Sequence, residues 1–139
     1  MKKQFFSELK VALVHDWLNG MRGGEKCLEV ICELFPDADL FTLIHQKGEV
    51  SNVIETMKIK TSFLQKLPFV MKNYRYFLPF FPYAIEQFDF TKYDLIISSS
   101  HCVAKGIKKD DSVYHISYVH APMRYVWDQF DTYFRQPRI

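Results

Sequence analysis

The 139-residue sequence has little net charge and no long apolar run. Lysine and arginine number 18 and aspartate and glutamate 16, so the formal net charge is only +2. This near balance argues against a protein that binds nucleic acid through many phosphate contacts. The longest stretch without Asp, Glu, Lys or Arg is Ser112 to Met123, which has 12 residues. That length is too short for a helix that crosses a bilayer.

Cysteine is scarce and follows no known pattern. Cys27, Cys32 and Cys102 are odd in number and show no C-x-x-C spacing, so the sequence predicts neither a disulfide framework nor a zinc knuckle. We expect three small apolar residues in the interior. Two lysines near the start are typical of a signal peptide, but Glu8 and Lys10 interrupt the apolar region that such a peptide needs. We therefore expect a cytoplasmic protein.

The sequence does contain short apolar segments separated by turns. These segments predict five strands, at Lys10–Val14, Leu40–Ile44, Met57–Lys60, Tyr93–Ser98 and Tyr114–Val119. Such short unbroken strands, alternating with helices, are typical of a parallel sheet that is covered on both faces. The predicted fold class is α/β, with a Rossmann-like parallel sheet. Residues 1–139 form one domain of ordinary length, in which residues 1–9 are a polar lead-in.

Two helices are predicted from apolar spacing. The first covers Glu25 to Phe35 and ends at Pro36; its buried face is predicted from the i, i+3, i+4, i+7 spacing of Cys27, Val30, Ile31 and Leu34. The second begins at Pro122, a residue that is tolerated in the first turn of a helix, and it is predicted from the helical spacing of Tyr125 or Val126, Gln129, Phe130 and Tyr133.

Candidate site residues fall at the predicted carboxyl ends of the strands, where open α/β sheets bind ligands. His15, His101 and His120 each lie at or just after a strand end. The turn Gly20-x-x-Gly23-Gly24 also lies there, directly before a helix. Glycines let a backbone approach a phosphate, and a helix N-terminus offers free N–H groups to it. The alternative is an ordinary tight turn whose glycines adopt positive φ.

Two better-known phosphate loops do not fit the sequence. Counted from Gly20, the Walker pattern would need Gly-Lys-Ser or Gly-Lys-Thr where Glu25-Lys26-Cys27 stands. The dinucleotide fingerprint needs an acidic residue at the end of the second strand, which here reads Leu43-Ile44-His45-Gln46. Neither ATP hydrolysis nor NAD binding is favoured.

Four segments together carry a family resemblance. They are VALVHDWL, RGGEK, SSSHCVAKG and YVHAPMRYVWDQFDTYF, and they occur in this order between Lys10 and Phe134. In these segments the chain resembles the amino-terminal, acceptor-side half of bacterial family 4 glycosyltransferases, in the mannosyltransferase-like branch that makes surface polysaccharide. The resemblance implies a GT-B architecture, in which two Rossmann-like domains face each other.

The resemblance also implies an activity and roles for named residues. It implies transfer of a hexose, with retention of configuration, from a nucleotide sugar to a saccharide or lipid-linked acceptor; GDP-mannose is one candidate donor, and no metal is expected. Gly23 and Gly24 would approach the donor diphosphate, and His120 would lie beside the transferring sugar as the catalytic residue. The residues implied near the acceptor are His15, Asp16, His101, Lys105 and Arg124. Arg124 could hold a phosphate or a carboxylate through its planar fork.

The chain departs from the family in one large respect. The family's second domain binds the nucleotide and carries a glutamate pair spaced E-x7-E, and this donor-binding domain is absent from the 139 residues. Glu25 and Glu33 have that spacing on the first predicted helix, which we interpret as a coincidence: Glu33 would be solvated, and Glu25 would favour the helix dipole in its first turn. We therefore expect the isolated chain to be inactive.

A basic, aromatic segment allows a second interpretation. No acidic residue occurs from Thr56 to Ile85, and eight aromatic residues lie between Phe63 and Tyr83. Such a segment suits the surface of an anionic membrane, which would place the protein on the inner face of the membrane as a peripheral component. The alternative is that these aromatics form the domain's own core and a cover over the cleft, and we favour the core for most of them. A stand-alone, non-catalytic module that binds a membrane or a partner is thus the alternative to an enzyme half.

Overall fold

The structure is a computed structural model that describes residues 8–100 and 102–120. In this part of the chain the strands are β1 (Val11–His15), β2 (Asp39–Thr42), β3 (Lys58–Thr61), β4 (Leu95–Ser100) and β5 (Tyr114–Val119). They form one sheet in the order β3-β2-β1-β4-β5, and every neighbouring pair is parallel. The predicted Rossmann-like α/β fold is therefore confirmed, and each predicted strand overlaps an observed one.

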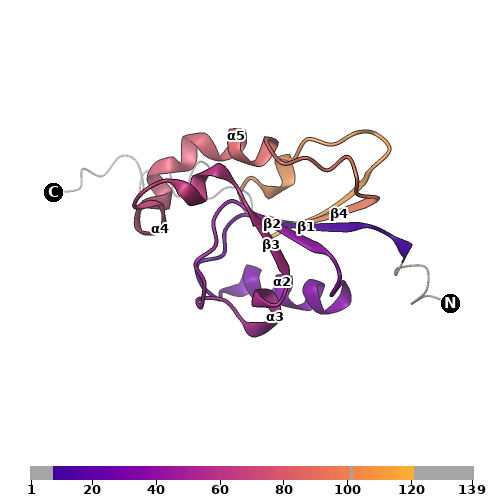
Figure 1. Cartoon of the computed structure of the whole chain (residues 1–139), viewed down its shortest axis with the longest axis horizontal. Coiled ribbons are helices and arrows are strands. Elements are labelled where there is room, and N and C mark those ends of the chain that lie inside the picture. Colours follow the sequence, from indigo (N-terminus) through magenta and orange to yellow (C-terminus); the bar gives the residue numbers. More distant parts are fainter. Residues whose placement is uncertain (1–7, 101, 121–139) are drawn as a thin grey trace.

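Helices lie on both sides of this sheet (Figure 1), although most side chains of the edge strand β5 are exposed. Helices α2 (Gly23–Leu34) and α3 (Asn52–Glu55) lie below the sheet in that view. The upper layer contains α4 (Val70–Asn73) and α5 (Phe81–Glu86). The same stretch of sequence includes two 3-10 helices, η1 (Phe63–Lys66) before α4 and η2 (Tyr74–Phe80) between α4 and α5. A third 3-10 turn, η3 (Ala104–Gly106), follows β4. No helix of the described residues is long and apolar enough to cross a membrane. The helix predicted after Pro122 lies outside the described residues.

The two layers enclose two separate hydrophobic clusters. Along β1, Val11 and Leu13 pack into the cluster between the sheet and helices α2 and α3. Ala12 and Val14 pack into the cluster on the other face, between the sheet and α5 with its neighbours. This alternation follows from the period of two in a strand, because successive side chains point to opposite faces. Both faces of β1 are buried, so the central strand is apolar at every position except its last, His15.

The predicted buried face of the first helix is correct only in part: Cys27 and Ile31 are partly buried, and Ile31 packs against the core, but the other two residues are exposed. Val30 is 55 % exposed and Leu34 is 69 % exposed, while the buried side chains of α2 are Glu25, Leu28 and Cys32. Both sets repeat with the period of a helix, so spacing alone did not separate them. The true face was overlooked because it includes a carboxylate, and an ionisable side chain is rarely buried unless it has a charged or polar partner.

The expectation that most aromatics between Phe63 and Tyr83 form the core is also wrong. Of the eight, Phe81 is buried and Tyr74 and Phe77 pack partly against the core. The other five are exposed: Phe63, Phe69, Tyr76, Phe80 and Tyr83. Because η2 contributes no buried residue, its aromatic side chains lie at the surface or pack only partly against the core.

Two of the three cysteines occupy the interior as predicted. Cys32 and Cys102 are buried and Cys27 is partly buried, and all three are free thiols. Burial of Cys32, together with the nearby charges of Glu29 and Glu33, raises the pKa of its thiol to about 12. This thiol therefore stays protonated, which makes it a packing residue rather than a nucleophile.

Candidate functional site

The candidate site lies where the strand order reverses. From β1 the chain builds outward through β2 to β3 and then crosses back to β4 and β5, so β1 and β4 flank the reversal point. His15 ends β1 and is the register partner of Ser99, the penultimate residue of β4. In open parallel sheets, ligands bind beyond the carboxyl ends of the strands at such a reversal. The topology therefore places His15 and Ser99 at the position most suited to a ligand.

His15 is fully buried at this position. Its Nδ1 atom lies 3.0 Å from the main-chain carbonyl oxygen of Ser99. A carbonyl oxygen only accepts hydrogen bonds, so we assign a proton to Nδ1, which donates it. The other ring nitrogen, Nε2, faces the Glu25 carboxylate at 3.9 Å. The imidazole is thus held in one orientation by a strand on one side and a helix on the other.

Glu25 was not predicted as a site residue, yet its carboxylate is buried in the first turn of α2. Burial by itself would raise the pKa of this carboxyl, but His15, then a backbone hydrogen bond and then Arg22 outweigh burial and lower the pKa below its ordinary value. Arg22 approaches Glu25 Oε1 to 3.6 Å through Nη1, which also donates to Asn19 Oδ1 at 3.2 Å. Glu25 is therefore ionised at neutral pH, and its carboxylate lies beside the Nε2 atom of His15 and the guanidinium of Arg22.

His120 reaches the same place from the end of β5. Its main-chain N–H donates to the Ser100 carbonyl, and its Nε2 atom lies 2.7 Å from Ser99 Oγ. The ring also packs beside Tyr118, with centroids 4.8 Å apart. Burial first, and then the nearby His15, lower the pKa of His120 below its ordinary 6.5, although Asp16 and Glu25 act in the opposite direction. His120 is therefore neutral at pH 7, and its ring can donate and accept a proton.

Both imidazoles converge on Gly24, the second residue of α2. A Cβ atom built on Gly24 would lie 3.6 Å from Cδ2 and Nε2 of His120 and 3.6 Å from Cε1 of His15. A Cβ on Gly23 would meet nothing within 4 Å. Among the described glycines, the one with positive φ is Gly48, so the alternative of a turn that needs positive φ at Gly23 or Gly24 is wrong. Neither backbone conformation nor packing against the chain requires these two glycines.

Asp16 holds the loop that follows β4. Its carboxylate accepts hydrogen bonds from three main-chain N–H groups, those of Cys102 at 3.0 Å and of Val103 and Ala104 at 2.7 Å each. The side chain is fully buried. Asp16 therefore fixes the start of η3 relative to β1. The role implied for it near an acceptor stays a prediction.

The structure brings together part of the predicted residue set. His15, Asp16, Gly23, Gly24 and His120 gather at the carboxyl ends of β1, β4 and β5. His101, Arg124 and the side chain of Lys105 lie outside the described part. Glu33 is exposed, as predicted, and it lies away from the buried Glu25.

Two residues of the cluster were missed in the sequence. Glu25 could not be found from sequence because a carboxylate on an amphipathic helix is normally solvated. Ser99 did carry a signal, since Ser98-Ser99-Ser100 is a polar run at the end of an apolar strand. Ser100 Oγ is buried there and has no hydrogen-bond partner among the described residues.

The arrangement combines anion-binding and proton-holding groups. The start of α2 offers N–H groups that favour an anion, and Arg22 precedes it as the N-cap residue without capping it through its side chain. Within residues 8–100 and 102–120, no group of three or more His, Cys, Asp or Glu side chains is placed to hold a metal ion. Comparison of the chain with known protein families, curated proteins and solved structures gives no match.

Proposed function

We propose that this chain is the acceptor-side domain of a glycosyltransferase, which moves a hexose from a nucleotide sugar to a saccharide or lipid-linked acceptor in surface polysaccharide synthesis. In this proposal the N-terminus of α2 faces the donor diphosphate and His120 lies beside the transferring sugar. The ordered likeness of the VALVHDWL, RGGEK and YVHAPMRYVWDQFDTYF segments to family 4 enzymes supports it. The donor would be held from its other side by a second domain.

The observation that carries the proposal is the convergence of His15 and His120 on Gly24. A residue with a side chain at position 24 would fit the fold, because a Cβ there makes only ordinary contacts at 3.6 Å. A glycine that the fold does not need is explained if a ligand must approach the backbone closely. The ligand at a helix N-terminus is expected to be an anion, and a diphosphate meets this requirement.

The charges around the loop favour such an anion. Glu25 would repel a phosphate if it stood alone, but the Arg22 guanidinium lies 3.6 Å from its carboxylate and offsets the charge. The Arg22 side chain is 58 % exposed, so its guanidinium can contact a phosphate from the solvent side while it remains near Glu25. His120 is neutral at pH 7 and can therefore hydrogen-bond to a sugar hydroxyl without adding a second full charge.

Magnitudes limit what this domain does on its own. A phosphate at a helix N-terminus gains about 0.3–1 kcal/mol, and up to about 2 kcal/mol in a sheltered position. Millimolar binding needs about 4 kcal/mol. Transfer also requires a water-poor enclosure that orients both substrates. The 139-residue chain alone should therefore bind a nucleotide sugar weakly and transfer no sugar.

The proposal is tested by NMR titration of the uniformly labelled chain with GDP-mannose and, for comparison, other nucleotide sugars. Concentration-dependent shifts are expected at Gly23, Gly24 and His120, with a Kd above about 1 mM. The variant Gly24→Ala should keep or raise the melting temperature, because alanine favours a helix by about 1 kcal/mol over glycine. The same variant should weaken binding at least about tenfold, since its methyl group occupies the approach to the backbone.

A matched glycine variant controls for nonspecific effects. Gly106→Ala adds a methyl group as well, at a position where nothing lies within 4 Å, and it should leave the titration unchanged. Absence of shifts at the start of α2 with every nucleotide sugar would overturn the proposal. Equal weakening by Gly24→Ala and Gly106→Ala would also overturn the assignment of the Gly23–Gly24 loop.

A further inference from the structure

We propose that the five exposed aromatic residues of the upper layer, Phe63, Phe69, Tyr76, Phe80 and Tyr83, form a ridge that docks onto an anionic lipid bilayer. We call these residues the aromatic ridge. They come from η1, the N-cap of α4, η2 and α5, which follow one another in the chain. Phe63 and Tyr83 are 20 residues apart in sequence, yet their ring centroids lie 5.9 Å apart in edge contact. The ridge therefore joins side chains from the start and end of the segment.

Basic side chains accompany the ridge and acidic ones do not. Thr56 to Ile85 contains no acidic residue, while Lys66 and Lys72 are exposed on η1 and α4. Lys60 is not counted, because its ammonium lies 3.5 Å from the Asp39 carboxylate. The first acidic residue after the segment, Glu86, is paired with Lys108 at 3.3 Å. The ridge thus presents a net positive charge around its aromatic rings.

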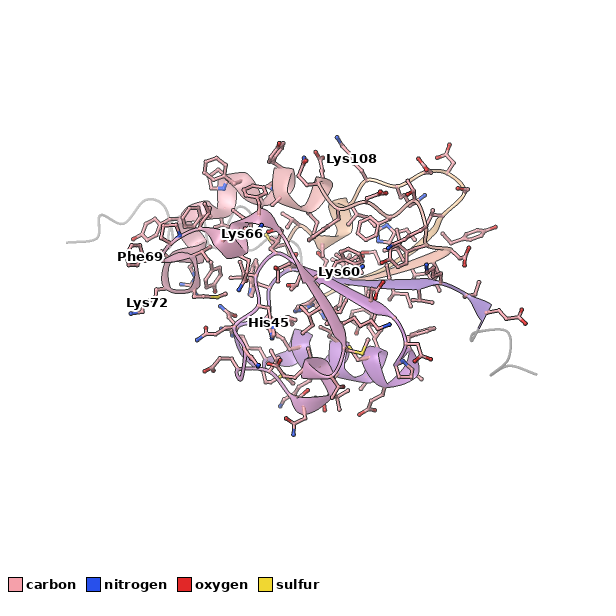
Figure 2. All side chains as sticks on the ribbon, in the orientation of Figure 1. His45, Lys60, Lys66, Phe69, Lys72 and Lys108 are labelled. Carbon is pink, nitrogen blue, oxygen red and sulfur yellow. The ribbon has the colours of Figure 1, made fainter. Side chains whose placement is uncertain are left out.

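Among the ridge residues, Phe69 is the clearest case of a side chain that the backbone directs toward solvent. It is 76 % exposed and its φ angle is 64°, in the left-handed region that a bulky residue seldom adopts. Figure 2 shows Phe69 and Lys72 together at the left end of the molecule, beside α4. Local strain of this kind costs about 1–2 kcal/mol. A residue that favours the left-handed region would avoid this cost, so an aromatic residue here points to a role outside the fold.

The combination of exposed aromatic rings and neighbouring lysines suits a lipid surface better than a protein partner. Aromatic rings are favoured at the level of the lipid headgroups, and lysines beside them are attracted by anionic lipids. Short helices lying side by side insert their rings to a shallow depth, which matches a surface interaction and not a membrane span. Charge complementarity therefore selects the occupant, which is a bilayer rich in anionic phospholipid.

The ridge is located near the candidate site but does not depend on it. Because η1 begins two residues after β3 ends, the segment leaves the sheet at the carboxyl edge. His15 and His120 lie at the same edge, at the ends of β1 and β5. Membrane docking would thus hold this edge close to the bilayer. The proposal stands whether or not the chain binds a nucleotide sugar, and its test uses no sugar.

The test is co-sedimentation of the full chain with vesicles of phosphatidylcholine and phosphatidylglycerol in equal parts, at low salt. Binding is expected, and it should be lost with phosphatidylcholine alone and at about 1 M salt, where the screening length falls to about 3 Å. Removal of each lysine charge should weaken binding about fivefold, so the double variant Lys66→Gln/Lys72→Gln should lose roughly 25-fold. Phe69→Ala should lose roughly tenfold through the missing apolar contact.

Matched variants on the opposite layer are the controls. Lys26→Gln removes one exposed charge from α2, and Leu34→Ala removes an apolar side chain that is 69 % exposed on the same helix. Both should bind vesicles as the unmodified chain does, and circular dichroism should show that all variants are folded. No pelleting with anionic vesicles at low salt would overturn the proposal. So would ridge variants that bind vesicles normally but dissociate a dimer in sedimentation velocity, because the ridge would then cover a second copy of the chain.

Discussion

His15 and Glu25 face each other in the interior of the domain, with Nε2 and Oε1 separated by 3.9 Å. The pair connects the last residue of the central strand to the first turn of the first helix, and the glycine loop lies between them in the chain. His15 is fixed in turn by the Ser99 carbonyl. The start of α2 is therefore anchored to both β1 and β4, and the direction in which its N–H groups point is determined by this contact.

Glu25→Gln should destabilise the fold in a pH-dependent way. Interaction with His15 and Arg22 lowers the pKa of Glu25 despite its burial, so the ionised carboxylate stabilises the folded state above its ordinary pKa of 4.5. That stabilisation is lost as the pH falls through the lower, folded-state pKa. We expect the variant to lose about 1 kcal/mol or more at pH 7, with a difference that shrinks below pH 4.5. Urea unfolding from pH 3 to 7 measures it.

Glu33→Gln is the matched control for that measurement. Glu33 lies on the same helix but is exposed, so its substitution should change the unfolding free energy by less than about 0.5 kcal/mol at every pH. A Glu25→Gln difference that stays constant with pH would contradict the assigned pair.

Asp16→Ala should be among the most destabilising single changes. It leaves the N–H groups of Cys102, Val103 and Ala104 without their acceptor in the interior. Each such loss costs about 1–3 kcal/mol, so a total on the order of 3 kcal/mol or more is expected in urea unfolding. Asp16→Asn keeps one acceptor oxygen and should cost clearly less. Equal losses for the two variants would show that the hydrogen bonds are not the cause.

His120 should titrate below its ordinary value. Burial and the neighbouring His15 lower its pKa, so its NMR titration midpoint should lie below 6.5. Unfolded chains take up this proton more readily, and the domain should therefore lose stability as the pH falls below 6.5. His15→Gln removes one of the two causes and should move the midpoint upward, while His45→Gln should not. A midpoint at or above 6.5 in the folded chain would contradict the described environment.

Phe69 offers a comparison of glycine with alanine at one position. At φ 64° alanine is strained and glycine is not, so Phe69→Gly should be more stable than Phe69→Ala by about 1 kcal/mol. If residue 69 had an ordinary helical or extended backbone, the alanine variant would be the more stable of the two. Thermal unfolding of the two variants measures the difference. A more stable alanine variant would show that residue 69 does not adopt the left-handed conformation.

The sheet could be predicted from sequence because it depends on local composition. A buried strand such as β1 is a short apolar run, and the five predicted segments agree with the observed strands to within two residues at each end. The short elements α3 and α4 were not predicted, since four residues are too few to show a periodic pattern. The buried face of α2 was predicted only in part, because the observed face includes Glu25. That face is defined by a charge partner on another element, which spacing within one helix cannot reveal.

The candidate site was predictable only where it follows strand ends. His15 and His120 were found because polar residues directly after apolar runs must lie at the carboxyl edge of the sheet. Gly24 was found from its place before a helix. The link between these residues is made by Ser99, which bonds one imidazole through its carbonyl and the other through its hydroxyl. Such a link depends on the strand register of β1 and β4, and register cannot be read from either segment alone.

Trp17 gives the proposed lipid surface and the proposed sugar site a shared component. It follows His15 and Asp16 in the chain, is buried, and packs against Tyr74 and Phe81, with ring centroids 5.3 and 5.8 Å away. An indole in a close-packed interior cannot shift without its neighbours. If displacement at one place is transmitted to the other through Trp17, the equilibrium coupling between them is reciprocal. Whatever factor vesicles impose on the affinity for a nucleotide sugar, the sugar must impose on the affinity for vesicles.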